Sequence, residues 1–360
     1  RRSPPPPHAP HHRQLQSERA PHARRFLRID VAVKVAARPI EQQLVERHGE
    51  PPRRVGVVGA GLIGRAWSLV FARAGCQVGV GDPSVEVRDA LPERLAADAA
   101  LLERHGLLDD PAAALARIRI SPSVEDAVGD AELVQENGPE DVDVKRALFE
   151  TLDRVAPRNA ILASSTSAIV ASRFTEALPG RERCLVAHPV NPPHLVPLVE
   201  LCGAPWTTQE VMGRCHALYR AVGQVPVVVK REVEGFVLNR LQGAVLAEAF
   251  RLVGEGVISP EDLDRTMSDG LGTRWSFLGP FATIDLNAPG GMADYCERYT
   301  GFYRRLAGDP PGEEAFGQAN VQEVLARWPH DPDPDRLAAA TQERNERLAA
   351  LAAHKHRSAP

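Results

Sequence analysis

Three polar clusters interrupt otherwise apolar stretches of the sequence, and together they hold the groups that oxidation of an alcohol requires. The first is the hydroxyl run 164–167, the second is 188–193 followed by Glu200, and the third is 235–240, which includes Asn239. The second cluster opens with His188, and a histidine can accept a proton near neutral pH. A carboxylate can orient that base, and neutral hydroxyl and amide groups can donate hydrogen bonds to the oxygen.

Each cluster also has an ordinary structural explanation. Runs of Ser and Thr commonly form turns and helix caps, and an Asn near the start of a helix is often a cap. A lone His is usually a satisfied surface or core side chain. The clusters therefore favour chemistry only if one fold brings them to the same place.

The segment 54–64 predicts the fold that would do this, because an apolar strand leads into Gly-x-Gly-x-x-Gly and then into a helix. In a dinucleotide site, Gly59 permits the tight turn, Gly61 lets the backbone approach the pyrophosphate, and Gly64 lets the helix pack on the strand. The anion lies at the positive end of that helix. A second predicted strand ends at Asp82, near the position about 20 residues on where a carboxylate holds the ribose and repels the 2′-phosphate of NADP. The pattern predicts an NAD site; the alternative is a similar domain with a glycine-rich turn and no ligand.

Strands and helices alternate after this motif, which is typical of a doubly wound parallel sheet. The further strands are expected at 118–120, 133–135, 161–163 and 184–186, with edge strands at 197–202 and 225–229. From Gly235 onward only helices are predicted, the first of them over 236–253. We therefore expect an α/β Rossmann domain over 54–232 and an all-α domain over 233–355. Ligands bind beyond the carboxyl ends of such strands, and the polar clusters follow predicted strands.

Bulk properties exclude several classes of protein. A formal net charge of −4 argues against capture of nucleic acid or membrane as the main role. Uninterrupted apolar runs of about 18 residues are absent, so no membrane span is expected. The five cysteines lack metal-ligand spacing and predict reduced thiols of a cytoplasmic protein, without a metal or disulfides. Residues 1–53 are rich in Pro, His and Arg and predict a disordered, dispensable extension.

Several longer motifs resemble the 3-hydroxyacyl-CoA dehydrogenase superfamily, and the resemblance covers 54–344. They are segments 55–64, 164–167, 188–193 with 197–201, and 235–242. Three further segments are most similar to its lambda-crystallin, or L-gulonate 3-dehydrogenase, branch: 259–264, 267–272 and 279–280. The N-terminal extension lies outside the resemblance.

The resemblance implies NAD-dependent oxidation of a 3-hydroxyl group. It implies His188 as general base, Glu200 as the acceptor of a hydrogen bond from its other ring nitrogen, and Ser167 and Asn239 as partners of the reacting oxygen. The implied NAD contacts are Gly59, Gly61, Leu62, Ile63, Gly64, Asp82, Glu140, Lys145, Ser167 and Asn191. For Glu140 and Lys145, spacing alone favours an exposed helix pair.

The substrate that best fits the resemblance is L-gulonate, which would be oxidised to 3-dehydro-L-gulonate, with its carboxylate met by Arg274 or Arg240. The region 93–117 has three arginines, no lysine and several acids, which disfavours a coenzyme A tail. The alternatives are a short-chain (S)-3-hydroxyacyl-CoA dehydrogenase and a non-catalytic crystallin-like or redox-sensing protein. A homodimer through the helical domain is also implied.

Overall fold

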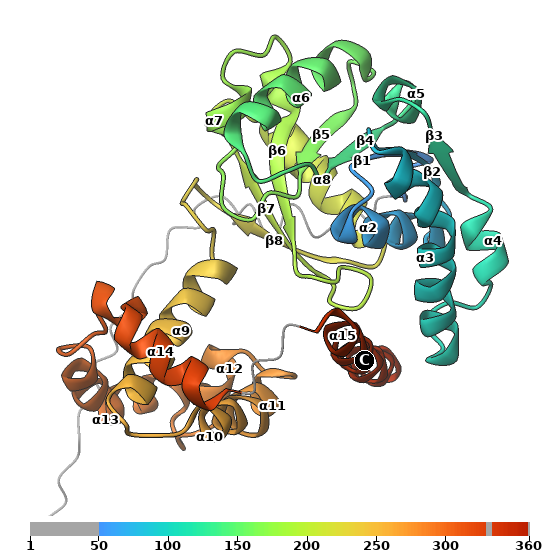
Figure 1. Ribbon diagram of the computed structural model, residues 1–360. Helices are drawn as coiled ribbons and strands as arrows, with labels where there is room; N and C mark the ends of the chain where they lie inside the picture. The colour runs from blue at the N-terminus through green and yellow to red at the C-terminus, as the bar shows by residue number, and fades with distance from the viewer. Residues whose placement is uncertain (1–49, 329–332, 359–360) are drawn as a thin grey trace, which may run out of the picture. The chain divides into compact units, whose positions relative to one another are not determined.

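The computed structural model describes residues 50–328 and 333–358, so nearly all of the expected extension lies outside the described residues. An eight-stranded sheet of order β3-β2-β1-β4-β5-β6-β7-β8 forms the first part (Figure 1). The strands are β1 (Arg54–Val58), β2 (Gln77–Gly81), β3 (Ile118–Ser121), β4 (Leu133–Glu136), β5 (Ile161–Ser164), β6 (Cys184–Pro189), β7 (Leu198–Gly203) and β8 (Val225–Val229). Strand pairs from β3 to β6 are parallel, whereas β7 runs antiparallel to β6. The predicted Rossmann-like sheet is confirmed.

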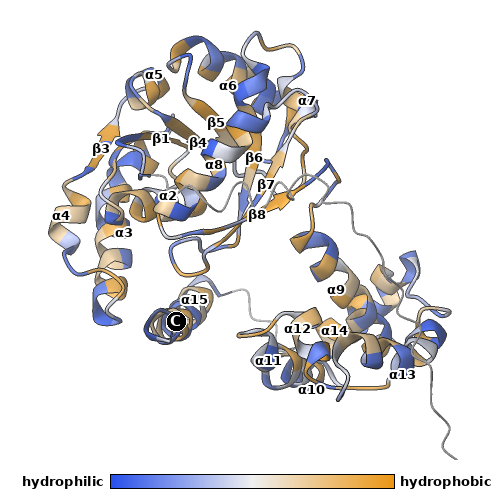
Figure 2. Ribbon diagram, turned by 180° about the vertical axis from the view of Figure 1, so that it is seen from behind, coloured by the Kyte–Doolittle hydropathy of each residue, from blue (hydrophilic) through white to orange (hydrophobic). Residues whose placement is uncertain are grey.

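Helices cover both faces of this sheet. Successive side chains of a strand point to opposite faces, so alternate residues of the buried strands belong to two different hydrophobic cores. On β1, Val57 belongs to the hydrophobic core on one face of the sheet, whereas Val58 belongs to the core on the other face. Leu133 and Val134 of β4 divide in the same way. Figure 2 shows mostly hydrophobic strands between helices in which hydrophobic and hydrophilic residues are mixed. The helices are α2 (Leu62–Arg73), α3 (Val85–Arg104), α4 (Pro111–Leu115), α5 (Val124–Val128), α6 (Val142–Val155), α7 (Ser172–Thr175) and α8 (Gln209–Ala221).

Helix α2 is held rigidly, which fixes its N-terminus at the end of β1. Trp67 stacks on Phe71 with ring centroids 5.3 Å apart, and its ring lies 5.4 Å from that of Tyr219 on α8. All three side chains are fully buried. Aromatic pairs at these distances add roughly 0.5–1.5 kcal/mol beyond burial.

After residue 235 the described chain is helical, as predicted. The elements are α9 (Leu238–Gly254), α10 (Pro260–Arg265), a π-helical segment (Thr266–Gly272), α11 (Thr273–Trp275), α12 (Pro280–Asp285), α13 (Gly291–Leu306), α14 (Gln318–Arg327) and α15 (Pro334–Arg357). Helix α9 begins two residues later than Phe236, where we expected it, because Phe236 has a left-handed backbone with φ +49°. On α15, Glu346 hydrogen-bonds His105, which follows α3, at 2.7 Å. Among the described helices, none is both long and apolar enough to cross a bilayer.

Candidate active site

Two antiparallel strands bring His188 and Glu200 together. In the register of β6 and β7, these residues lie directly opposite each other, and cross-strand partners place their side chains on the same face. His188 Nδ1 and Glu200 Oε2 are 2.9 Å apart, and the two residues are 5% and 2% exposed. The other ring nitrogen of His188, Nε2, makes no hydrogen bond within the described residues. The pair therefore has the geometry of an oriented base with one nitrogen left for a substrate proton.

The second oxygen of Glu200 binds the start of helix α9. Glu200 Oε1 accepts hydrogen bonds from the backbone N–H groups of Val237 and Leu238, each at 2.9 Å. Phe236, at the left-handed corner before the helix, is fully buried with its ring centroid 5.7 Å from that of His188. Burial raises the pKa of Glu200, but the hydrogen bonds from His188, Leu238 and Val237 together hold that pKa below its usual range. Glu200 is therefore ionised at neutral pH.

Replacement of this carboxylate by an amide gives a pH-dependent prediction for stability. Because the pKa of Glu200 is lower in the folded state, its stabilisation is complete above the unfolded value of about 4.3 and is lost as pH falls through the folded value. We expect Glu200→Gln to lose about 1.5–3 kcal/mol of unfolding free energy at pH near 7. Urea unfolding of both proteins across the acid range measures this. A difference in unfolding free energy between wild type and Glu200→Gln that stays constant down to low pH would contradict the role of the Glu200 charge.

Only one of the four clustered hydroxyl groups is free to meet a ligand. Ser164 is buried and donates to Glu136, and Thr166 is buried and donates to Glu140. Ser165 Oγ contacts Gln135, Trp67 and Asn137. The Ser167 hydroxyl is exposed and has no hydrogen bond within the described part of the chain. This pattern agrees with the choice of Ser167 that the resemblance implied.

The backbone around Ser167 is held from two sides. Glu140 accepts hydrogen bonds from the N–H groups of Ser167 and Ala168, at 3.2 and 3.1 Å. Asn239 Nδ2 donates to the Ser167 carbonyl oxygen at 2.7 Å. One N–H of the Asn239 amide therefore binds the backbone, and this contact places the amide next to Ser167.

Glu140 and Lys145 are not the exposed helix pair that their spacing favoured. Glu140 precedes α6. Burial raises the pKa of Glu140, but hydrogen bonds from Thr166 and from the Ala168 and Ser167 amides, together with the charge of Lys145, hold that pKa below its usual range. Lys145 is 1% exposed, and its Nζ lies 3.0 and 3.1 Å from the two carboxylate oxygens of the buried Glu136. The prediction from spacing was wrong for Lys145, because spacing along α6 does not show that the helix packs against the end of β4, where Glu136 lies.

Glu136 itself was missed by sequence reasoning. It ends the buried strand β4 and also accepts a hydrogen bond from the N–H of Gly138 at 2.6 Å. An acid at the end of an apolar strand was the available signal, because a buried charge needs a partner. The Glu136–Lys145 pair fixes the loop that leads to Glu140.

The glycine loop fits a pyrophosphate. Gly59 has φ +86°, and a side chain there would lie 2.8 Å from the Asn137 carbonyl oxygen. A Cβ on Gly64 would lie 1.8 Å from the Gly59 carbonyl oxygen, so only glycine permits this close packing. In the part of the chain that the structure describes, no atom lies within 4 Å of a Cβ built on Gly61, and no side chain caps the N-terminus of α2. Free amides at a rigid helix N-terminus suit a bound anion.

Asp82 follows β2 and organises the same loop. Its Oδ2 accepts from the N–H of Ala60 at 2.7 Å, and its Oδ1 accepts from the N–H of Ser84 at 2.9 Å. Leu62 and Asn191 are exposed, and Ile63 is half-buried. The residues at this end of the sheet therefore fit an adenine dinucleotide.

A second histidine in the loop after β6, His194, is unsuited to act as a base. It is 3% exposed, and neither ring nitrogen has a hydrogen-bond partner within the described residues. Burial and the charges of Arg73, Arg65 and Arg344 lower its pKa to about 3. His188 is therefore the better base of the two.

The described residues also contain no cluster of three or more His, Cys, Asp or Glu that could hold a metal ion.

Comparison with known protein families defines the class of this protein. Residues 54–233 match the NAD-binding domain of 3-hydroxyacyl-CoA dehydrogenase, and residues 235–325 match the C-terminal domain of the same family. The chain belongs to the 3-hydroxyacyl-CoA dehydrogenase family, and its first domain binds NAD.

Individual relatives narrow the comparison. The chain is 45% identical to the lambda-crystallin homolog of Bos taurus over 311 residues, which is 85% of this chain and 96% of the bovine protein. It is 36% identical to an L-carnitine dehydrogenase of Oceanobacillus iheyensis over 69% of this chain and 80% of that protein. A solved structure of an NAD⁺-dependent 5-formyl-3-hydroxy-2-methylpyridine 4-carboxylic acid 5-dehydrogenase is similar with a TM-score of 0.74 and 29% identity, covering 83% of this chain and 97% of that chain. The resemblance to the lambda-crystallin branch is confirmed.

Proposed function

We propose that this protein oxidises the 3-hydroxyl group of a free 3-hydroxy acid, with L-gulonate as substrate, 3-dehydro-L-gulonate as product and NAD as hydride acceptor. The observation that carries the proposal is the buried His188–Glu200 pair, in which one imidazole nitrogen has no hydrogen-bond partner among the described residues. Similarity to lambda-crystallin homologs supports the gulonate branch. Similarity to an enzyme of L-carnitine, itself a free 3-hydroxy acid, supports the substrate class.

In the proposed mechanism, His188 Nε2 accepts the proton of the substrate 3-hydroxyl group while the C3–O bond of the substrate becomes a carbonyl. His188 Nδ1–H donates to Glu200 Oε2 throughout, which fixes the tautomer and stabilises the imidazolium. The Ser167 hydroxyl and the Asn239 amide donate to the reacting oxygen. Bound NAD supplies the acceptor for the hydride that leaves C3, so the products are a ketone, NADH and a proton.

The nucleotide-contact roles complete the proposal. Backbone N–H groups of Gly61, Leu62 and Ile63 would bind the pyrophosphate, and Asp82 would bind the adenine ribose. Asn191 and Ser167 would lie on the nicotinamide side, where both are exposed. Glu140 and Lys145 would act on the cofactor through the loop that they hold. The proposed nucleotide-binding part is 54–232, and the proposed helical part is 233–355.

We also propose a cytoplasmic homodimer joined through the helical part. Large apolar side chains are exposed there, among them Phe277 at 60%, Phe281 at 71% and Leu286 at 72%. Such side chains are typical of surfaces that bind another protein. The cytoplasmic assignment is supported by free cysteines, four of which are buried.

An NADH-formation assay on the full chain tests the function. We expect kcat/KM for L-gulonate to exceed that for 3-hydroxybutyrate and for (S)-3-hydroxybutyryl-CoA by more than about tenfold. The first comparison compound lacks the further hydroxyl groups of L-gulonate, and the second carries a coenzyme A tail. NAD should be preferred to NADP, since Asp82 would repel a 2′-phosphate.

Other outcomes select the alternatives. Turnover of the thioester alone would replace gulonate with a short-chain (S)-3-hydroxyacyl-CoA, which the family description favours. Binding of NAD without turnover of any substrate would leave the non-catalytic, crystallin-like role.

A further inference from the structure

A hydrogen-bond network lies at the carboxyl ends of β4 and β5, and the proposed reaction does not yet use it. Its centre is the hydroxyl group of Ser165, in the loop after β5. The Trp67 indole and the Gln135 amide donate to Ser165 Oγ at 3.1 and 2.7 Å, and this hydroxyl donates to Asn137 Oδ1 at 2.7 Å. A serine hydroxyl has one donor and two acceptor positions. Every hydrogen-bonding position of Ser165 is therefore occupied.

Two carbonyl groups determine the direction of the hydrogen bonds in this network. Asn137 Nδ2 donates to the carbonyl oxygens of Val58 and Gln135, at 3.2 and 2.9 Å, so the amide oxygen of Asn137 faces Ser165. Because the single O–H of Ser165 binds Asn137, its lone pairs must accept from Gln135 Nε2. Gln135 Oε1 then faces Tyr219 on α8, whose hydroxyl donates to it. The network therefore has a single hydrogen-bonded arrangement.

The end of the network at α8 is sealed from water. Tyr219, Gln135 and Trp67 are fully buried. Burial raises the pKa of Tyr219 well above its ordinary value, so its hydroxyl keeps the proton that it donates. Buried polar groups rely on protein partners. Loss of the Tyr219 hydroxyl would therefore leave Gln135 Oε1 without a donor among the described residues and would free the amide to turn.

One side of the network supports the glycine loop. The backbone N–H of Asn137 donates to the Val58 carbonyl oxygen at 2.7 Å, at the end of β1. A Cβ on Gly59 would lie 2.8 Å from the Asn137 carbonyl oxygen, and a Cβ on Gly64 would lie 3.2 Å from Asn137 Nδ2. Trp67 belongs to α2, which begins within this loop. The network therefore contacts both the loop and the helix proposed to bind the pyrophosphate.

The other side of the network leads to the groups proposed for catalysis. Ser165 and Ser167 belong to the same loop after β5. Gln135 Nε2 also lies 3.5 Å from the carbonyl oxygen of Ala187, which precedes His188 on β6. The network therefore contacts the loop that contains the free hydroxyl and the strand that contains the base.

We propose that Ser165, Gln135 and Tyr219 are positioning residues that hold the Ser167 loop and the His188 strand in place relative to the glycine loop, an inference that rests on the proposed function. Hydride transfer requires a defined geometry, and a displacement of about 1 Å can slow a reaction about 10²-fold. These residues act through their neighbours rather than on the substrate. Their loss should therefore slow the chemical step in protein that is folded and has NAD bound.

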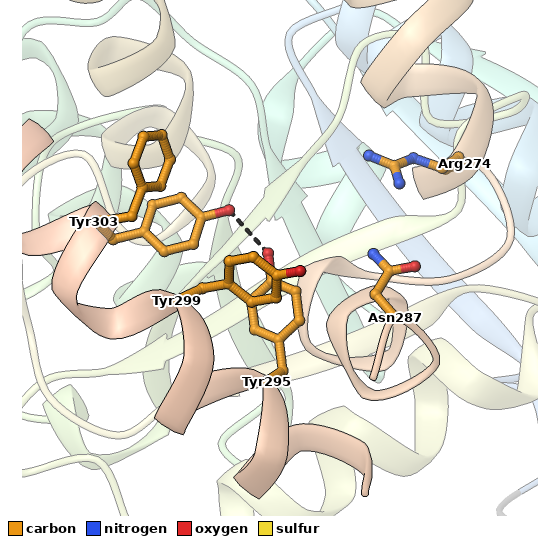
Figure 3. Close-up of a pocket in the computed structure, with 6 residues that line it drawn as sticks. Arg274, Asn287, Tyr295, Tyr299 and Tyr303 are labelled. Atoms are coloured by element: carbon orange, nitrogen blue, oxygen red, sulfur yellow. Dashed lines mark hydrogen bonds between the residues drawn. The ribbon is translucent and has the colours of Figure 1, made fainter. Parts of the chain in front are cut away.

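The test compares Tyr219→Phe and Ser165→Ala with the matched control Tyr303→Phe in the full-length protein. Tyr303 lies on α13, and its hydroxyl oxygen is 2.8 Å from that of Tyr295, a hydrogen bond drawn in Figure 3. Both Tyr→Phe variants remove one phenol hydroxyl and its hydrogen bond, but only the Tyr219 hydroxyl belongs to the network. The quantity measured is the single-turnover rate of NADH formation at saturating NAD and L-gulonate.

The rate should fall about tenfold in Tyr219→Phe and about 10- to 100-fold in Ser165→Ala, whereas Tyr303→Phe should match wild type. The dissociation constant of NAD should change less than this rate, because Asn137 keeps its bonds to Val58 and Gln135 in each variant. Urea midpoints are measured separately. A wild-type single-turnover rate in either Tyr219→Phe or Ser165→Ala, whatever its urea midpoint, would make the network purely structural and overturn the proposal.

The proposed function can fail separately. If wild type oxidises only (S)-3-hydroxybutyryl-CoA, the same rates are compared with that thioester. If it oxidises neither compound, hydrogen exchange of the Ser167 and Ala168 amides in NAD-bound protein still tests the network. Exchange in Ser165→Ala should be about tenfold faster than in wild type, since the variant lacks hydrogen bonds that hold this loop. Exchange at the wild-type rate would overturn the proposal.

Discussion

The variant His188→Gln is expected to lose a factor of about 10²–10⁴ in kcat for alcohol oxidation, the usual contribution of a positioned general base. Its affinity for NAD should stay at the wild-type value, because the glycine loop and Asp82 are built from β1, α2 and β2. Glutamine keeps a polar group near Glu200 but cannot accept a proton at neutral pH. The loss should therefore appear in the chemical step.

Steady-state kinetics with L-gulonate and calorimetric titration with NAD measure these two quantities. The matched control is His194→Gln, which changes the buried histidine whose pKa is lowered to about 3. We expect the control to retain kcat within about threefold of wild type, since His194 takes no part in proton transfer. The reverse result, with a severe loss only in the His194 variant, would overturn the choice of base.

The variant Lys145→Met is expected to lose about 3–5 kcal/mol of unfolding free energy, the cost of leaving a buried charge without its partner. Glu136 is fully buried, and its remaining hydrogen bonds within the described residues would be those from Ser164 and Gly138. The loss should show as a lower urea midpoint. It should be smaller in the double variant Glu136→Gln with Lys145→Met, because that protein has no buried charge at this position.

Arg146→Met is the matched control at the next position of α6. Arg146 pairs with Asp143 at the exposed surface, with side chains 49% and 84% exposed, and such pairs contribute about 0–1 kcal/mol. A Lys145→Met protein as stable as the Arg146→Met protein would show that the Glu136–Lys145 pair contributes little.

The parts of the fold that depend on local chemistry could be predicted from the sequence. The glycines of 59–64 lie between an apolar run and a helical pattern, which is typical of a strand–turn–helix unit, and the structure has β1 and α2 there. Alternating strands and helices then predicted the sheet, and the predictions of family and cofactor are confirmed. These features succeed because turn geometry and apolar periodicity are local.

Features that depend on packing between distant segments could not be predicted. The sequence does not show that Glu140 holds the Ser167 loop or that Glu200 also binds the start of α9. Lys145 is buried because α6 packs over the end of β4. Its spacing from Glu140 had suggested an exposed position. The delayed start of α9 follows from the left-handed backbone of Phe236, a rare conformation for a non-glycine residue.

The proposed role of His188 is tested most directly by the rate of NADH formation in a single turnover with L-gulonate, compared between wild type, His188→Gln and His194→Gln. We predict a rate in His188→Gln that is about 10²–10⁴-fold below that of wild type, because glutamine cannot accept the hydroxyl proton. In His194→Gln the rate should stay within about threefold of wild type. A His188→Gln protein that keeps the wild-type rate would contradict the account.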